Sequence, residues 1–196
     1  MTTDNFRKHS SKNPLQKLLI ERFLSVLVDE TQALHPVSIL DAGCGEGFTL
    51  ERFRLAGICQ RLEGIDLEQR AIDLGRAIHP RLSLTQGNIY QLPYADDSFD
   101  AVVCSEVLEH LERPEEALKE LCRVASRYTI ITVPHEPFFR LANLLRGKNI
   151  SRWGNDIEHI QHWSAQGIAN LVRTEFKVRT VRTPFPWTFV VGEKRT

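Results

Sequence analysis

The stretch ILDAGCGEGF, from Ile39 to Phe48, places three glycines directly behind a short apolar run that ends in an acid, Asp41. An apolar run of this length, closed by glycines, predicts a buried strand that turns sharply into a helix. The glycines let the backbone bend and let a ligand approach the main chain, and the amides at the start of the helix face that ligand. The stretch therefore predicts a ligand site beyond the carboxyl end of the first strand of an α/β sheet.

The rest of the chain alternates strands with helices. Strands are predicted over 37–41, 61–67, 82–88, 100–104 and 128–133, and helices over 13–34, 48–56, 68–80, 113–125 and 164–174. This alternation predicts βαβ units and a mostly parallel sheet. Two further strands, 177–183 and 187–194, have so short a link that they must run antiparallel.

Two segments fall outside this rhythm. Residues 1–12 read as frayed, and 134–163 form a long segment of mixed character behind the carboxyl end of a strand. Insertions at that place are more often functional lids than scaffold. We expect a single domain over 1–196, with 1–36 as an N-terminal helical segment and 134–163 as a lid-like insert that shapes the acceptor site.

Composition narrows the class of protein. The 196 residues carry 25 Lys+Arg and 25 Asp+Glu, and this zero net charge argues against a partner held mainly by phosphate neutralisation, such as nucleic acid. The four cysteines show no CxxC spacing, which favours reduced thiols. The start lacks the apolar centre of a signal peptide, and no apolar run approaches the ~20 residues that span a bilayer. We expect a cytoplasmic protein without a membrane span.

The acids around the glycines indicate the kind of ligand. The spacing is GxGxG rather than the GxGxxG of dinucleotide-binding loops, and Asp41 would be poorly placed beside a pyrophosphate but suits a positive charge. Asp66 ends the second predicted strand, where an acid can accept hydrogen bonds from two ribose hydroxyls. A nucleoside with a cationic tail fits both acids.

The ordered set ILDAGCGEG, LEGIDL and LTQGNIYQLPYADDSFDAVVCSEVLEHL resembles the class I S-adenosylmethionine-dependent methyltransferases over about residues 37–133. The methyltransferase type 11/12 group is similar, as are, in part, the ubiquinone-pathway O-methyltransferases. The resemblance implies a Rossmann-like sheet of seven strands in the order 3-2-1-4-5-7-6, with strand 7 antiparallel and helices on both faces. It implies S-adenosyl-L-methionine as the cofactor.

By the same resemblance, Asp41 and the glycine loop would contact the amino-acid part of the cofactor, and Asp66 would hold the ribose. Asn88 would meet the adenine amino group with Ile89 near the ring, although many members of the family carry Asp where this chain has Asn88. The residues expected to bind the cofactor are Asp41, Gly43, Cys44, Gly45, Gly47, Asp66, Leu67, Asn88, Ile89 and Ser105.

The run SEVLEHL suggests a second site. If it is helical, Glu106 shares a face with Glu109 at i, i+3 and with His110 at i, i+4, and such a group could hold a divalent metal. The ubiquinone-pathway and small-RNA 3′-end methyltransferases look similar here and add a histidine after the fifth strand; His159 is the best match, with His135 and His162 as spares. The alternative is that His110 packs near the cofactor or the acceptor without a metal.

Methyl transfer requires mainly alignment and exclusion of water, with a base only if the acceptor must lose a proton. His110 and His135 are the candidate bases, whereas Glu136 reads as a loop residue between two prolines. Aromatic residues of the insert could line an acceptor pocket or pack on the sheet. Its basic residues could recognise an anionic acceptor or form a solvated face. They are Phe138, Phe139, Trp153, Trp163, Arg140, Arg146, Lys148 and Arg152.

The sequence therefore predicts a methyltransferase that acts on oxygen or nitrogen of a small molecule. Two alternatives stay open. One is metal-assisted RNA 2′-O-methylation, and the other is an NAD-binding oxidoreductase or a non-catalytic nucleotide-binding module. The sequence leaves the oligomeric state open.

Overall fold

A seven-stranded sheet organises the computed structural model, which describes residues 3–136 and 160–195. Its strands are β1 Ser38–Ala42, β2 Arg61–Asp66, β3 Ser83–Gln86, β4 Phe99–Ser105, β5 Ala125–Pro134, β6 Phe176–Arg182 and β7 Trp187–Lys194. They lie in the order β3-β2-β1-β4-β5-β7-β6, with β1 to β5 parallel and β7 antiparallel to both of its neighbours. The predicted strand order and the antiparallel final pair are confirmed.

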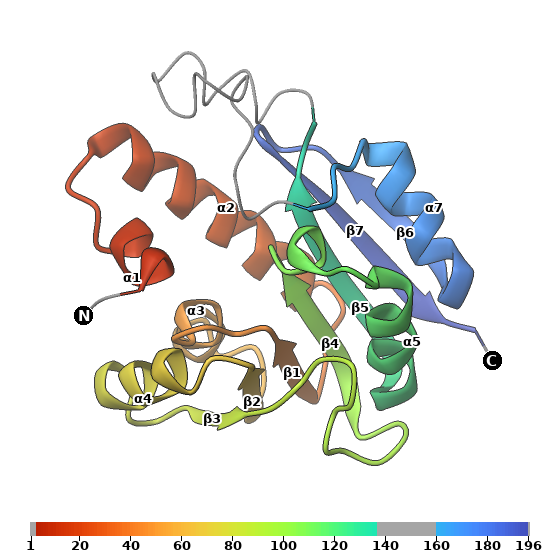
Figure 1. Ribbon diagram of the computed structural model, residues 1–196, viewed down its shortest axis with the longest axis horizontal. Helices are drawn as coiled ribbons and strands as arrows, with labels where there is room; N and C mark the ends of the chain where they lie inside the picture. The colour runs from red at the N-terminus through yellow and green to blue at the C-terminus, as the bar shows by residue number, and fades with distance from the viewer. Residues whose placement is uncertain (1–2, 137–159, 196) are drawn as a thin grey trace.

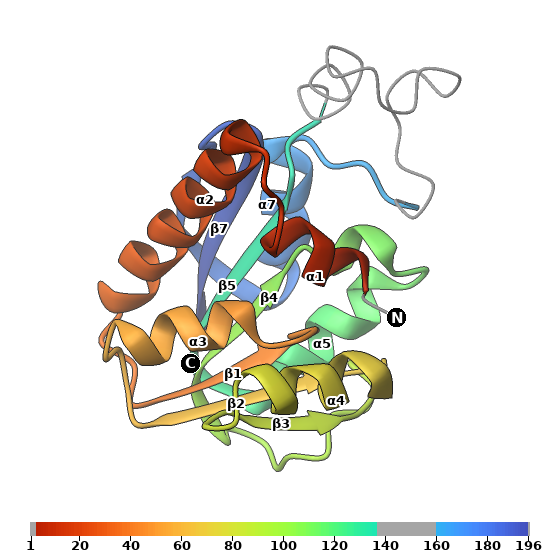
Figure 2. The ribbon, with the colours of Figure 1, turned by 90° about the vertical axis from the view of Figure 1, so that its left-hand side faces the viewer.

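Helices cover both faces of the sheet (Figures 1 and 2). They are α1 Asp4–His9, α2 Pro14–Gln32, α3 Phe48–Leu55, α4 Gln69–Ile78, the 3-10 helix η1 Leu108–His110, α5 Pro114–Val124 and α7 Ala165–Glu175. One buried apolar cluster contains side chains of α2, α3 and α4, and the other contains side chains of α5 and α7. The first group of helices therefore lies on one face of the sheet and the second group on the opposite face.

The middle residues of the central strands are apolar because both faces of the sheet are covered. In β4, Val102 belongs to the cluster beneath α5 and α7, whereas Val103 belongs to the cluster beneath α2 and α3. Both residues are fully buried, as are Ile39 and Leu40 of β1. Alternate residues of a strand point to opposite faces, so burial on both sides produces an unbroken apolar run rather than an alternating one.

The helices α2 and α7 each begin at a residue whose side chain caps the first turn. Asn13 caps α2 by accepting hydrogen bonds from the amides of Leu15 (3.0 Å) and Gln16 (3.3 Å), and Pro14 occupies the first turn. Ser164 caps α7 by accepting from the amide of Gly167 at 3.1 Å. In the described part of the chain, no helix is both long and apolar enough to span a membrane.

The expectation that residues 1–12 are frayed was wrong for residues 4–9. Asp4–His9 form α1, which lies against the start of α3 through Phe6 and His9 on the ring of Phe48. A six-residue helix is too short to be stable alone, so these tertiary contacts account for its presence. The lid-like insert predicted over 134–163 lies largely outside the described residues, as do Phe138, Phe139, Arg140, Arg146, Lys148, Arg152, Trp153 and His159.

Candidate functional site

The loop between β1 and α3 has a backbone that requires its glycines. Gly43, Gly45 and Gly47 have φ angles of 85°, 53° and 83°, in the left-handed region. The amides of Gly43 and Cys44 both donate to the carbonyl of Ile65, at 2.8 and 3.0 Å, and this ties the loop to the end of β2. A Cβ on Gly43 would lie 2.3 Å from Cγ2 of Val107. The sharp turn expected from the sequence is therefore present.

Asp66, the last residue of β2, is fixed beside this loop. Its Oδ2 accepts from the amide of Gly45 at 2.8 Å, and its Oδ1 accepts from the amide of Glu68 at 2.9 Å. A carboxylate has about four lone-pair positions, so two backbone donors leave acceptor capacity for hydroxyl groups. Leu67, next along the chain, is 67% exposed and offers an apolar surface beside the carboxylate.

Asp41 is a buried acid at the end of β1. Its side chain is almost inaccessible, and its Oδ1 has no hydrogen-bond partner among the described residues. Burial, and secondly the charge of Asp66, raise the pKa of Asp41 from 3.8 to about 7. An unsatisfied buried carboxyl oxygen is costly, so this position favours a ligand that brings a donor or a positive charge.

A third acid of the loop was missed in the sequence. Glu46 is fully buried, and its carboxylate accepts hydrogen bonds from Nδ2 of Asn5, at 2.5 Å, and from the hydroxyl of Thr3. No local pattern could have signalled this, because the partners lie 41 and 43 positions earlier in the chain. The N-terminal segment is thus bonded directly to the glycine loop.

The segment after β3 was expected to meet an adenine ring. Oδ1 of Asn88 accepts from the amide of Tyr90 at 2.9 Å, and Asn88 also forms a bridge with Gln91. The carbonyl oxygen therefore uses one of its two lone pairs within its own turn. Ile89 packs against the apolar cluster beneath α5.

The helix expected over SEVLEHL does not form, and the predicted metal-binding face is lost with it. Glu106 has a φ of 58°, and the short η1 begins only at Leu108. Oε2 of Glu106 accepts from Nε1 of Trp187 at 2.9 Å and Oε1 accepts from the hydroxyl of Thr132 at 3.4 Å, so its carboxylate is held by β5 and β7. A left-handed residue interrupts helical geometry, and the i, i+3 and i, i+4 relationships therefore do not apply.

The other acid and the histidine of that run, Glu109 and His110, both lie in η1. Glu109 is buried in η1, where its carbonyl accepts from the amides of Ile160 and Gln161, and His110 is half-buried. Within residues 3–136 and 160–195, no group of three or more His, Cys, Asp or Glu side chains could hold a metal ion. His159 lies outside the described residues, and Nδ1 of His162 lies 3.7 Å from Oε1 of Glu136. The metal prediction is therefore not supported.

Ser105 and His135 lie at the carboxyl ends of the two central strands β4 and β5. The hydroxyl of Ser105 is 2.9 Å from that of Thr132. The amide of His135 donates to the carbonyl of Pro186 at 2.8 Å, and its Nδ1 is 2.9 Å from the hydroxyl of Thr188. These bonds fix the orientation of the imidazole ring.

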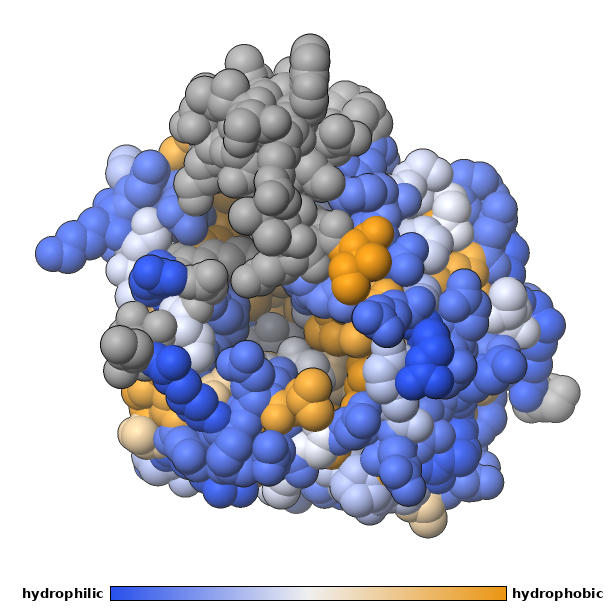
Figure 3. Space-filling model, in the orientation of Figure 1, coloured by the Kyte–Doolittle hydropathy of each residue, from blue (hydrophilic) through white to orange (hydrophobic). Residues whose placement is uncertain are grey.

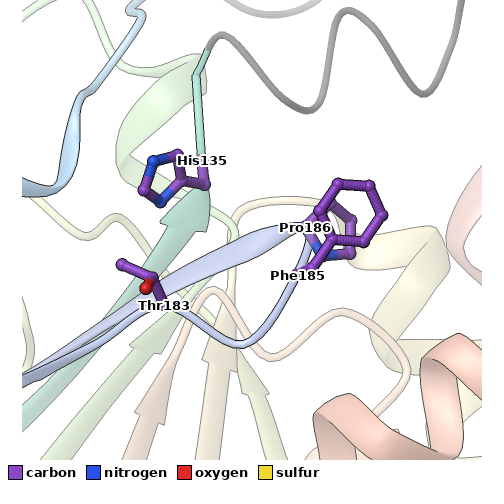
Figure 4. A pocket seen from close by; sticks show the side chains of 4 residues that line it. All are labelled: His135, Thr183, Phe185 and Pro186. Atoms are coloured by element: carbon purple, nitrogen blue, oxygen red, sulfur yellow. The ribbon is translucent and has the colours of Figure 1, made fainter.

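A small open pocket of about 180 Å³ adjoins this histidine (Figure 4). Its lining residues come from the end of β5 and from the link between β6 and β7; they are His135, Thr183, Phe185 and Pro186. A hollow is also visible near the middle of the face shown in Figure 3, with hydrophobic side chains at its rim. The pocket beside His135 lies past the carboxyl end of β5.

The two ends of the insert are anchored near the same edge. The amide of Glu136 donates to the carbonyl of Trp163 at 3.1 Å, and Nε2 of Gln161 donates to the carbonyl of Leu111 at 3.3 Å. Trp163 packs against the apolar cluster beneath α5 and α7, which favours the packing interpretation for this residue. The insert therefore starts and ends beside the segment that follows β4.

Comparison with known proteins gives consistent results. Residues 40–131 match the family model described as a methyltransferase domain. A probable S-adenosylmethionine-dependent methyltransferase of Mycolicibacterium smegmatis is 36% identical over 86 residues, which are 44% of this chain and 33% of that protein. A demethylmenaquinone methyltransferase of Lactobacillus johnsonii is 30% identical over 154 residues, 66% of this chain and 61% of that protein. The chain thus spans about a third of the first of these relatives.

Among solved structures, the magnesium protoporphyrin IX methyltransferase of Synechocystis with bound SAH superposes with a TM-score of 0.73 at 16% identity. The superposition covers 96% of this chain and 92% of that one. At this level of identity the likeness establishes the fold.

Proposed function

We propose, from the match of residues 40–131 to a methyltransferase domain and from the similarity to S-adenosylmethionine-dependent enzymes, that the chain transfers the methyl group of S-adenosylmethionine to oxygen or nitrogen of a small molecule. One observation carries the proposal. The glycine loop lies between a buried acid with an unsatisfied oxygen, Asp41, and a second acid, Asp66, that is held in place by two backbone amides.

The residues around the loop fit such a cofactor. Asp66 would accept hydrogen bonds from the ribose hydroxyls, and Leu67, Asn88 and Ile89 would surround the adenine. Asp41 would face the positive charge of the amino-acid part, which passes along Gly43, Cys44, Gly45 and Gly47. Ser105, at the end of the neighbouring strand, would complete the site. When bound, the sulfonium supplies an electrophilic methyl group.

The chain's own contribution is then to hold the acceptor in line with that methyl group and to exclude water. His135 is the better placed of the two candidate bases, because Thr188 fixes its ring and a pocket adjoins it. If the hydroxyl of Thr188 accepts from Nδ1, the neutral ring carries its lone pair on Nε2, which would be the atom that acts as the base. His110 is the second candidate, beside the ends of the insert.

A small acceptor is supported by the zero net charge and by the quinone-pathway relative of Lactobacillus johnsonii. The RNA alternative was motivated by a metal-binding face, which the described residues do not form, and by the basic insert, which lies largely outside them. The dinucleotide alternative conflicts with the loop spacing, with the acid at position 41 and with the family model.

Calorimetric titration of the purified chain with S-adenosylhomocysteine and, separately, with NAD tests the assignment. We expect saturable binding of the first compound and none of the second. Binding of NAD alone would remove the proposal. Transfer of a labelled methyl group to a panel of quinols, phenols and amines, with short RNA as a further acceptor, would then identify the acceptor class.

A further inference from the structure

The outer face of α2 carries two leucines where a helix that packs on a sheet is expected to be polar. Leu15 and Leu18 lie in the first two turns and are 55% and 65% exposed. Ile20 and Phe23 of the same helix are buried and belong to the apolar cluster beneath it. Leu18 projects from the side of the helix opposite to Ile20, because two residues correspond to about 200° of rotation. Packing in the core therefore does not explain these leucines.

Three cations flank the exposed leucines. Lys12, Lys17 and Arg22 are exposed, and none of them forms an ion pair with another of the described residues. The acid that lies between Lys12 and Arg22 in the sequence is Glu21, and it pairs with Arg52 of α3 at 2.7 Å. The start of α2 therefore concentrates positive charge, although the whole chain has zero net charge.

The arrangement of these side chains resembles that of a helix at a membrane surface. Arg22 follows Leu15 and Leu18 at i+7 and i+4 and shares their face of α2. Apolar side chains bordered by cations match a lipid surface, where acyl chains accept the former and anionic phosphates attract the latter. Lysine is depleted at the centre of protein–protein interfaces, and this favours lipid over a second copy of the chain.

The same end of the molecule holds the pocket beside His135. Figures 1 and 2 show the start of α2 level with the end of β5 and the start of β7. Phe23 packs on Trp187 with ring centroids 4.8 Å apart, and Trp187 directly follows Pro186, which lines the pocket. Leu18 precedes Phe23 by roughly 7.5 Å along the helix axis. Contact of this face with a membrane would therefore hold the pocket near the lipid.

We propose that the start of α2 docks on the surface of a membrane that contains anionic lipid. Leu15 and Leu18 enter the boundary of the acyl chains, and Lys12, Lys17 and Arg22 lie at the lipid phosphates. An acceptor that is itself anchored in the membrane suits a methyltransferase held in this way, and this last step rests on the proposed function.

Sedimentation of the purified chain with vesicles tests the docking. Vesicles of phosphatidylcholine alone are compared with vesicles in which about one third of the lipid is phosphatidylglycerol. We expect binding to the second kind with a partition coefficient roughly tenfold higher or more. Binding should fall between about 0.05 and 0.5 M salt, because salt screens the cations. Neither cofactor nor acceptor is present, so failure of the docking is distinguishable from failure of the proposed function.

Two matched pairs of variants separate this face from the rest of the surface. Leu18→Gln should lower the partition coefficient about fivefold, whereas Leu55→Gln, at a leucine of α3 that is 67% exposed, should leave it within about twofold. Lys17→Gln should lower it about fivefold and weaken its salt dependence, whereas Lys119→Gln, at an exposed lysine of α5, should do neither. All four side chains are exposed, so the variants should fold, and urea denaturation checks this.

Several results would overturn the inference. They are failure to sediment with either kind of vesicle, equal binding to both kinds, unchanged binding in Leu18→Gln, and equal losses in Leu18→Gln and Leu55→Gln. Sedimentation equilibrium without lipid addresses the competing occupant. A dimer that Leu18→Gln dissociates, in a chain that binds no vesicles, would assign this face to a second copy instead.

Discussion

Nε1 of Trp187 donates to Oε2 of Glu106 across 2.9 Å, linking the first residue of β7 to the residue that follows β4. The two residues are 81 positions apart in the chain. The indole ring is buried and packs on Phe23 of α2, with ring centroids 4.8 Å apart. Together with the bond from the hydroxyl of Thr132, the bond from Nε1 holds the carboxylate of Glu106 against β5 and β7.

Loss of that bond should destabilise the fold. We expect Trp187→Phe to lower the free energy of unfolding by about 1–3 kcal/mol, since it removes a donor to a carboxylate and leaves the acceptor half-buried. Urea denaturation measures the change. A double-mutant cycle with Glu106→Gln isolates the interaction, and strictly additive effects would show that the pair contributes nothing beyond packing.

Asp66 should govern binding of the adenosyl part. Asp66→Ala removes the predicted acceptor of both ribose hydroxyls and should raise the Kd for S-adenosylhomocysteine and for methylthioadenosine alike, by roughly tenfold to a hundredfold. Calorimetry on both ligands checks this. Because Asp66 also holds the amide of Gly45, Asp66→Asn serves as the control that keeps one acceptor oxygen for the loop. Unaltered affinity in Asp66→Ala would show that Asp66 does not bind the ligand and only ends β2.

Asp41 should make stability fall as pH rises. Its pKa is about 7 in the folded chain against 3.8 for an unperturbed aspartate, so between these values the folded state holds a proton that the unfolded state has lost. Unfolding free energy should therefore decrease from about pH 4 to above pH 7, by a few kcal/mol in total. Denaturation curves at pH 5 and pH 8 measure the difference. Asp41→Asn should flatten it, and an equally steep profile in that variant would assign the effect to another group.

The same group should couple ligand binding to protons. A cation placed beside Asp41 favours its ionised form, so S-adenosylmethionine should release a fraction of a proton when it binds near pH 7. Titrations in two buffers of different ionisation enthalpy measure that release. Asp41→Asn should abolish it and weaken binding.

Gly43 of the glycine loop and Gly57, which follows α3, offer a matched pair of substitutions. Gly43 and Gly57 both have positive φ, 85° and 65°, but a Cβ would collide with Val107 at the first and meet nothing within 4 Å at the second. Gly57→Ala should cost about 1–2 kcal/mol from backbone strain alone, and Gly43→Ala should cost distinctly more. Thermal and urea unfolding compare the two. Equal losses would mean that Val107 moves aside freely.

His135 should matter for turnover rather than for cofactor affinity. If it accepts the acceptor's proton, His135→Gln should lower kcat by about a hundredfold or more without changing the Kd for S-adenosylhomocysteine. Rate measurements await an identified acceptor. Thr188→Val removes the partner of Nδ1 and should lower kcat by a smaller factor. Normal turnover in His135→Gln would mean that His110, or no side chain, acts as the base.

Much of the fold could be predicted because its signals are local. Glycine spacing and apolar runs act within a few positions, and they located each strand and the helices α2, α3, α4, α5 and α7 to within a few residues. The candidate cofactor residues could be named for the same reason, since they sit at strand ends. Their roles in binding stay predictions.

The sequence by itself determined the order of strands and helices, the strained glycine turn and the acids beside it, because these follow from backbone preferences and periodicity along short stretches. Only the tertiary structure decided that α1 rests on Glu46 and that Glu106 turns to Trp187. In both cases the partner side chain lies more than 40 positions away, and no short-range pattern encodes a contact that exists only once the sheet has formed.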